Sequence, residues 1–345
     1  MRDKSVKDRH TKHRHPKDEP QKRKLKNDKP VILVVGLTPC MARTMMFERF
    51  ILGGVNRSES QAEYASGKGV NAVRAICTTN LAASFYLGLT GGDRTYAFLE
   101  ALKNLGSAYE SIDTYPNEIR LCTTIIDQMT GVVTELVEEP PAVAKSVAQS
   151  LLDSFDRIID DVDAVLVIGS VPKGLGNRTY KLMIDMAKEA GKLAVVDAAG
   201  AALTNALTAK PHVVRINENE LLGMVGATAK PSDEAVINAM RAVANQTGGA
   251  VVVSRAERST LVLEFGRVTE ITPPEVDVVS GIGGGDVMSG VITAMLACGK
   301  PLVEAVVFAQ ACAADSATTT RSAHFSLNRA KRMVGKIVKR DVGQG

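Results

Sequence analysis

The sequence predicts an α/β protein built on a doubly wound, mostly parallel β-sheet. Short apolar runs rich in β-branched residues recur along the chain, and stretches with helical periodicity separate them. Such runs are typical of strands buried on both faces, and repeated β–α units place helices on both sides of a parallel sheet. The strand-like runs are residues 31–36, 83–88, 164–169, 193–197, 212–217 and 250–254.

Two segments depart from this alternation. Residues 45–57 mix apolar and polar side chains around two glycines, which indicates short strands away from the main sheet. Residues 120–127 and 131–136 read as a β-hairpin that turns at 128–131. The predicted helices are residues 95–105, 142–160 and 179–191.

The composition excludes several classes of protein. Aromatic residues make up 4% of the 345 residues and there is no Trp, so stacking platforms for bases are not expected. No apolar run approaches the roughly 18 residues of a membrane span, and no membrane partner is expected. The five cysteines are far apart and form no C-x-x-C pair, which favours a reducing, cytoplasmic setting over a disulfide framework or a zinc site.

Residues 1–29 differ from the rest of the chain. They carry twelve Lys or Arg against five Asp or Glu, with almost no apolar side chain, so we expect a disordered basic tail. The segment has no apolar core of a signal peptide. It is either a solvated extension, or the result of a start codon assigned too early, or an arm that binds nucleic acid weakly.

Three consecutive glycines, Gly283 to Gly285, precede Asp286 and a segment with helical periodicity. A glycine loop that enters a helix leaves N–H groups unpaired at the helix start, where the helix dipole favours an anion. An aspartate there would repel that anion, unless it takes the proton of a hydroxyl that attacks a bound phosphate. The alternative is a glycine turn in which Asp286 only satisfies the helix dipole.

A second glycine-rich segment enters a helix at residues 66–71. Lys68 lies between Gly67 and Gly69, and Asn71 follows near the helix start. A lysine and an amide at this place can bind a phosphorylated or polyhydroxylated ligand, although a plain helix start explains the pattern as well. Asp197 ends the predicted strand 193–197, at the edge where open α/β sheets bind their ligands.

Five short motifs follow one another in a fixed order. They are Ser-Gly-Lys-Gly-Val-Asn at 66–71, Arg120, Gly-Ser-Val-Pro-Lys-Gly at 169–174, Asn-Glu-Asn-Glu at 217–220, and Gly-Gly-Gly-Asp at 283–286. Taken together they resemble the ribokinase-like PfkB family of sugar kinases, in particular the branch with 1-phosphofructokinase and tagatose-6-phosphate kinase. The resemblance runs from about residue 31 to about residue 326.

This resemblance implies an ATP-dependent kinase that transfers the γ-phosphoryl group to a hydroxyl of a sugar phosphate. Asp286 would be the general base. The amides of Gly283, Gly284 and Gly285 would hold the charge of the transferred group. Phosphoryl transfer of this kind asks the protein mainly for positioning and electrostatic stabilisation.

The resemblance also assigns a nucleotide side to the site. Asn217 would lie near the phosphates of ATP, and Glu220 would act on Mg²⁺ through water. Ser254 begins the segment where the family carries its S-x-G-x-x-G motif. Gly283 and Gly285 would contact the nucleotide as well.

On the acceptor side, the resemblance implies that Gly67, Lys68, Asn71 and Arg120 bind the substrate. Lys68 and Arg120 suit a phosphate already present on the sugar, because paired cationic donors bind phosphate oxygens well.

The family likeness further implies how the chain is organised. Residues 30–340 would form the ribokinase-like kinase domain. Segments of about 44–64 and 119–136 would form a small β-sheet lid over the sugar. In this family the lid often makes a homodimer interface, so a homodimer is expected.

The chain departs from the family pattern in three places. Residues 38–42 read Thr-Pro-Cys-Met-Ala where the branch has N-P-A-x-D, so Ala42 replaces an aspartate that grips sugar hydroxyls. Ala256 and Ser259 replace both glycines of S-x-G-x-x-G, and Arg215 stands where K-P-N begins. The acceptor sugar and the preferred donor are therefore left open. The alternative to an active kinase is a catalytically idle member of the fold that senses a nucleotide or a sugar.

Overall fold

The computed structural model describes residues 28–226 and 232–344, so residues 1–27 of the predicted basic tail lie outside the described part. The main sheet has ten strands in the order β14-β13-β12-β11-β10-β9-β8-β1-β4-β5. The seven strands from β11 to β5 are parallel, and β12 to β14 continue the sheet antiparallel. The strands are β1 (Val31–Gly36), β4 (Ala83–Thr90), β5 (Ala108–Asp113), β8 (Ala164–Ile168), β9 (Leu193–Asp197), β10 (Val213–Asn217), β11 (Ala250–Ser254), β12 (Thr260–Glu264), β13 (Arg267–Thr272) and β14 (Val338–Gln344).

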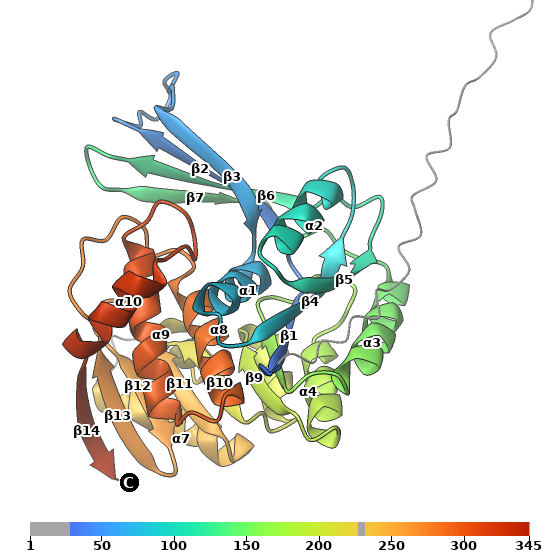
Figure 1. Cartoon of the computed structure of the whole chain (residues 1–345), viewed down its shortest axis with the longest axis vertical. Helices are drawn as coiled ribbons and strands as arrows, with labels where there is room; N and C mark the ends of the chain where they lie inside the picture. Colours follow the sequence, from blue (N-terminus) through green and yellow to red (C-terminus); the bar gives the residue numbers. More distant parts are fainter. Residues whose placement is uncertain (1–27, 227–231, 345) are drawn as a thin grey trace, which may run out of the picture.

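Helices cover both faces of this sheet, as the sequence predicts (Figure 1). Alternate residues of β1 enter opposite cores: Leu33 packs with α3 (Lys145–Ile159) to α7, and Ile32 packs with α1, α2, α8 and α9. This two-sided burial explains why the strands are continuous apolar runs. The remaining helices are α1 (Lys68–Thr79), α2 (Thr95–Asn104), α4 (Thr179–Glu189), α5 (Gly200–Leu207), α6 (Glu218–Met224), α7 (Asp233–Thr247), α8 (Gly284–Ala297), α9 (Leu302–Ala317), α10 (Leu327–Met333) and the 3₁₀ turn η1 (Val334–Lys336).

A separate four-stranded sheet projects from the α/β body (Figure 1). Its order is β3-β2-β6-β7, with β2 and β6 parallel and the two outer pairs antiparallel. We call it the lid sheet. Its strands are β2 (Cys40–Phe47), β3 (Ser60–Ser66), β6 (Arg120–Asp127) and β7 (Val133–Val137).

Two local differences from the sequence prediction have clear causes. Helix α3 begins at Lys145 rather than at residue 142, because Ala144 is extended and the amide of Val143 donates to the carbonyl of Lys173 at 2.8 Å. The lid sheet begins at Cys40 rather than near residue 44, because β2 pairs with β3 from Cys40 onward. No helix within residues 28–226 and 232–344 is long and apolar enough to cross a membrane.

Candidate active site

The fold brings two distant motifs into direct contact. Asn71 is in the first turns of α1 and Asp286 is the third residue of α8. The Asn71 Nδ2 atom donates to Asp286 Oδ2 at 2.8 Å, across 215 residues of sequence. Both helices start at the same edge of the sheet, so the two glycine-rich entries form one site.

Two of the three glycines before Asp286, Gly283 and Gly285, are required by close neighbours. Gly283 has a φ of +82°, and a Cβ atom there would lie 2.4 Å from the Ser322 hydroxyl oxygen. A Cβ atom on Gly285 would lie 2.6 Å from Nη2 of Arg215. The first helical hydrogen bond of α8 joins the Val287 amide to the Gly283 carbonyl at 3.0 Å, so the preceding amides have no acceptor within the helix. This helix start can hold an anion.

The Asp286 carboxyl is 7% exposed and lies among charges of both signs. Its pKa is raised to about 6, mainly by burial and also by the neighbouring Asp197 charge, while Lys68, Asn71 and Arg215 oppose the rise. A carboxyl group that titrates near neutral pH can accept a proton and release it again, which general-base catalysis requires.

Asp197 is a member of this site that the motifs did not include. It is fully buried at the end of β9, its Oδ2 accepts from Arg215 Nη1 at 3.1 Å and from the Ser289 hydroxyl, and its Oδ1 has no hydrogen-bond partner within the described residues. The Lys68 ammonium lies 3.6 Å from that Oδ1. The Asp197 charge is the main reason that the pKa of Lys68 is raised. Its place after a parallel strand was the sequence signal.

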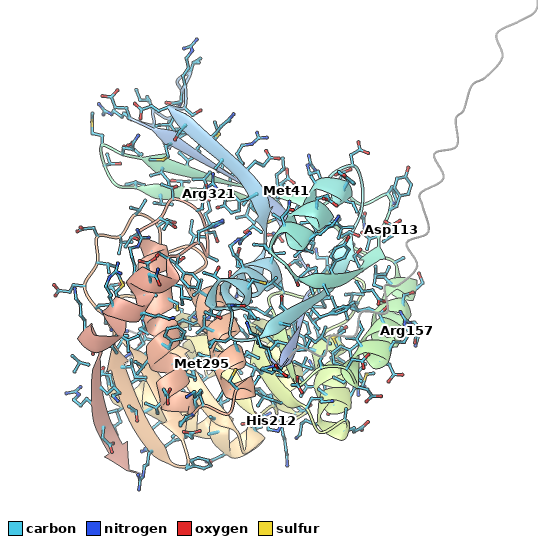
Figure 2. All side chains as sticks on the ribbon, viewed as in Figure 1. Met41, Asp113, Arg157, His212, Met295 and Arg321 are labelled. Atoms are coloured by element: carbon cyan, nitrogen blue, oxygen red, sulfur yellow. The ribbon has the colours of Figure 1, made fainter. Side chains whose placement is uncertain are left out.

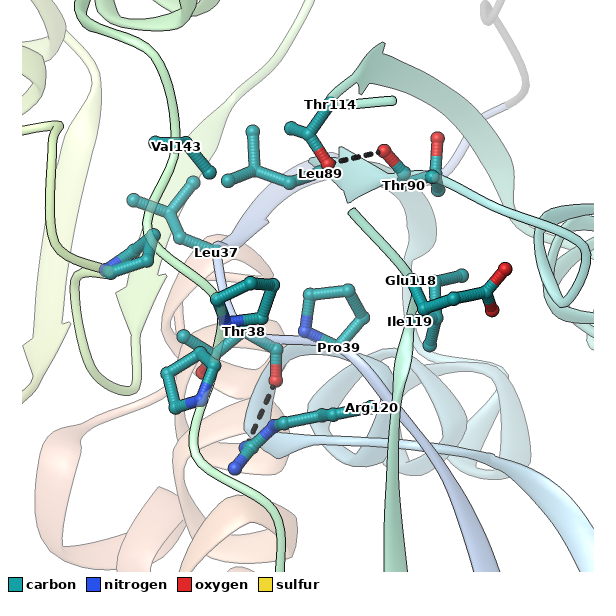
Figure 3. A pocket seen from close by; sticks show the side chains of 14 residues that line it. Leu37, Thr38, Pro39, Leu89, Thr90, Thr114, Glu118, Ile119, Arg120 and Val143 are labelled. Carbon is teal, nitrogen blue, oxygen red and sulfur yellow. Dashed lines mark hydrogen bonds between the residues drawn. The ribbon is translucent and has the colours of Figure 1, made fainter. Parts of the chain in front are cut away.

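Lys68 and Arg120 line one cavity of about 170 Å³, together with Thr38, Gly169, Ser170 and Ala199. Arg120 is held by the carbonyl of Glu138 at 2.9 Å and by that of Thr38 at 3.3 Å. Arg120 also lines a smaller neighbouring pocket of about 30 Å³. Figure 3 shows the residues of this pocket and the hydrogen bond from Arg120 to the Thr38 carbonyl. The two cations predicted to bind substrate therefore share a cavity.

Gly67 sets the entry of α1. Its φ of +99° is left-handed, and a Cβ atom there would lie 2.9 Å from the carbonyl oxygen of Thr38. Its own carbonyl accepts from the Asn71 amide at 3.0 Å. Only glycine fits this turn without strain, and the turn directs Lys68 into the cavity.

Asn217 and Glu220 pair with each other at the start of α6. The Glu220 amide donates to Asn217 Oδ1 at 2.8 Å, and the Asn217 amide donates to Glu220 Oε2 at 3.1 Å. This capping box gives both residues a structural role. Ser254 pairs in register with Asn217 and accepts a hydrogen bond from Arg215 Nη2 at 2.7 Å.

The residues present fit Mg²⁺ only in part. No cluster of three His, Cys, Asp or Glu side chains able to hold a metal occurs in the described portion of the chain. Asp197 Oδ1 is buried and accepts no hydrogen bond from the described residues, although the Lys68 ammonium lies 3.6 Å away, and carboxylate oxygen is the donor that Mg²⁺ prefers. Mg²⁺ usually keeps several waters and binds substrate phosphates, so this donor set suits an ion that arrives with a nucleotide.

Residues 254–259, where Ala256 and Ser259 replace glycines, keep a left-handed backbone at Ala256. Ala256 has a φ of +52°, a left-handed conformation that costs a non-glycine residue about 1 kcal/mol. The buried Arg255 guanidinium donates to Ser259 at 3.0 Å and to Asp233 at 2.6 Å, and it also pairs with Glu270. These contacts hold the loop in shape in place of the missing glycines.

Ala42 lies on β2, where it pairs in register with Tyr64 of β3 and Cys122 of β6. Its side chain is buried. Because the residue is an alanine, it supplies no carboxylate at this point of the lid sheet.

Ser322 is a further site residue that carried no sequence signal. Its hydroxyl accepts from Asn71 Nδ2 at 3.0 Å, and it comes from a loop outside every motif.

Comparison with known proteins agrees with this fold. The family model described as pfkB family carbohydrate kinase matches residues 30–328. The chain is 29% identical to 1-phosphofructokinase of Bacillus subtilis (strain 168) over 276 residues, which are 80% of this chain and 88% of that protein.

Solved structures of phosphofructokinase-2 from Escherichia coli share the fold at low sequence identity. The complex with potassium has a TM-score of 0.79 at 20% identity, and covers 89% of this chain and 98% of that one. The tetrameric inhibited form has a TM-score of 0.78 at 20% identity, and covers 89% and 99%. Because the family model spans most of its length, the chain belongs to the pfkB family of carbohydrate kinases.

Proposed function

We propose that this protein transfers the γ-phosphoryl group of ATP to a hydroxyl of a sugar phosphate. The observation that carries the proposal is the buried Asp286 carboxyl at a glycine-rich helix start, near a cavity that Lys68 and Arg120 line. The likeness to a 1-phosphofructokinase supports a phosphorylated acceptor.

In this proposal Asp286 accepts the proton of the attacking hydroxyl. A general base contributes on the order of 10²–10⁴-fold to the rate. The amides at the glycine-rich start of α8 stabilise the charge of the transferred group, because they are fixed in place before the reaction. Asn71 holds the Asp286 carboxylate toward the acceptor.

Lys68 and Arg120 bind the phosphate of the acceptor. Lys68 is fixed by Asp197 and Arg120 by two backbone carbonyls, so little ordering is needed on binding. Ala42 leaves the lid sheet without the carboxylate that would hold a pair of hydroxyls. The acceptor is therefore similar to fructose 1-phosphate or tagatose 6-phosphate in its charge, and is held mainly by its phosphate.

The nucleotide lies on the side of Asn217, Glu220 and Ser254, against Gly283 and Gly285. Asp197 and Glu220 would hold Mg²⁺ through water. The ion would neutralise charge on the phosphates of ATP.

The lid sheet closes over the acceptor and excludes water, and it joins two copies of the chain in a homodimer. Large apolar side chains that are exposed in a single copy support this assembly. They are Ile51, Leu52, Val55, Met129, Val132, Leu136 and Val137. Light scattering of the purified protein tests the dimer.

The five free cysteines of the chain suit the reducing environment of the cytoplasm.

The direct test of the function is an ADP-release assay with ATP and Mg²⁺. The panel contains fructose 1-phosphate, tagatose 6-phosphate and fructose 6-phosphate, each beside its unphosphorylated sugar. We expect turnover with at least one sugar phosphate and at least 100-fold lower kcat/KM for the matching free sugar, because Lys68 and Arg120 lose their partner. Nucleotide binding without turnover of any sugar would instead support an idle sensor.

A further inference from the structure

Tyr64 connects the lid sheet to a loop of the α/β body. Its hydroxyl accepts a hydrogen bond from the Ser322 amide at 2.9 Å, and it lies 3.2 Å from the hydroxyl of Thr44 on β2. Figure 2 labels the neighbouring Arg321, which lies in the loop between α9 and α10. One phenol oxygen thus joins two lid strands to this loop.

The aromatic ring of Tyr64 is fixed by its neighbours. The ring of His324 meets it edge-on at 5.3 Å between centroids, and the Arg74 guanidinium lies 5.7 Å from its centre. Burial lowers the pKa of His324 to about 4, so this contact is with a neutral imidazole at neutral pH. The hydroxyl is therefore held toward Ser322.

From Ser322 the connection continues to the catalytic carboxyl. The Ser322 hydroxyl accepts from Asn71 Nδ2 at 3.0 Å, and the same Nδ2 atom donates to Asp286 Oδ2 at 2.8 Å. The amide orientation of Asn71 follows from chemistry, because Arg74 can only donate and its Nη1 lies 2.9 Å from Asn71 Oδ1. The Asn71 amide nitrogen must therefore face both Ser322 and Asp286.

The end of β3 also contacts the side-chain amide of Asn71, on the side of its oxygen, and the neighbouring Arg74. The Ser66 hydroxyl donates to Asn71 Oδ1 at 3.0 Å, and the Ala65 carbonyl accepts from Arg74 Nη2 at 2.6 Å. Three successive residues of one lid strand thus act on Asn71 or on its direct partners. A helix start alone does not require such contacts.

We propose that Tyr64 is a positioning residue, which couples docking of the lid sheet to the orientation of the Asp286 carboxylate through Ser322 and Asn71. When the lid sheet docks, the Tyr64 hydroxyl fixes the 322 loop, and the Ser322 hydroxyl then keeps Asn71 Nδ2 on Asp286. When the lid sheet moves away, that support is lost. The base is thus best oriented only while the acceptor is enclosed.

Tyr64→Phe tests this, because it keeps the ring and removes only the hydroxyl. We expect kcat to fall about five- to ten-fold, with less than a three-fold change in the KM of the acceptor. The Asn71 hydrogen bond lowers the pKa of Asp286, so weakening it moves the acid limb of kcat to higher pH. The other charges that face this carboxyl, Lys68, Asp197 and Arg215, are untouched in the variant.

Two further variants separate coupling from simple damage. Ser322→Ala should shift the acid limb in the same direction, and adding Tyr64→Phe to it should shift the limb no further, because both act through one connection. Tyr96→Phe, at an exposed tyrosine of α2, is the matched control and should leave the profile unchanged. A loss of kcat with an unmoved acid limb, or fully additive shifts in the double variant, would overturn the proposal.

The inference rests on the proposed kinase activity, so one readout avoids turnover. The Asp286 carboxyl carbon can be titrated by ¹³C NMR in the ligand-free protein, with Asp286→Asn for assignment. A higher midpoint in Tyr64→Phe supports the coupling even if no sugar phosphate is turned over. An unchanged midpoint contradicts it even if the unmutated protein is an active kinase.

Discussion

The Lys68 ammonium lies 3.6 Å from a carboxylate oxygen of Asp197, and the Asp197 side chain has no exposed surface. A buried carboxylate is retained only where charge partners offset its loss of hydration. Lys68 and Arg215 supply that compensation, and Lys68 also enters the substrate cavity. Asp197 therefore influences two groups that the reaction uses, Lys68 and Asp286.

Asp197→Asn is expected to move the acid limb of kcat to lower pH. The Asp197 charge raises the pKa of Asp286, so its removal lets Asp286 ionise more easily. The turnover number also falls, because Lys68 loses the partner that fixes it. The measurement is kcat between pH 5 and 8, with the exposed Asp113→Asn as control. An acid limb that moves upward would contradict the assigned charge interaction.

Asp286→Asn is expected to stabilise the folded protein at neutral pH. The pKa of Asp286 is raised to about 6 in the fold, so the native state binds a proton that the unfolded chain has released above about pH 4. Stability due to this group is therefore present below pH 4 and is lost as the pH rises through 6. We expect the variant to gain on the order of 2 kcal/mol at pH 7 in urea unfolding. The gain should vanish near pH 4, and a gain that is independent of pH would refute the linkage.

The three glycines should respond differently to alanine. Gly285→Ala places a Cβ atom against the Arg215 guanidinium, and Gly283→Ala adds backbone strain to a clash with Ser322. Each of these two variants should have a free energy of unfolding about 1–3 kcal/mol below that of the unmutated protein. Gly284→Ala meets nothing closer than 4.0 Å and lies in a helix, so it should gain about 0.5–1 kcal/mol. Equal losses at all three positions in urea unfolding would show that these contacts do not set the requirement for glycine.

Ala256→Gly should stabilise the loop that follows β11. Its φ of +52° is one that glycine adopts without strain, so we expect a gain of about 0.5–1 kcal/mol in unfolding free energy. Ala201→Gly, on the exposed face of α5, is the control and should lose about as much. A loss at Ala256 would show that Arg255 and its partners already relieve the strain.

Much of the fold could be predicted because its strands are buried on both faces. The run that became β1 is apolar at every position, since its alternate side chains enter two different cores. The antiparallel extension β12 to β14 was not predicted. β13 and β14 carry charged residues among apolar ones, and β12 and β13 are joined by a tight turn at Phe265 and Gly266.

The site could be predicted only where glycine and its neighbours form a local pattern. Asn71 and Asp286 stand in such patterns, and the fold joins them. Ser322 and Tyr64 do not, because their role depends on a contact between segments 258 residues apart. Arg215 could be recognised as a departure from a motif, but its packing against Gly285 requires the tertiary structure.

The most direct test of the account compares the unmutated protein with Asp286→Asn. Phosphorylation of the acceptor found in the screen is followed by ³¹P NMR, and ATP binding is measured by calorimetry on the same samples. We expect the variant to lose at least 100-fold in kcat while its affinity for ATP stays within a few-fold, because only the base is removed. Turnover by Asp286→Asn that is comparable to that of the unmutated protein would contradict the role of Asp286 as the general base.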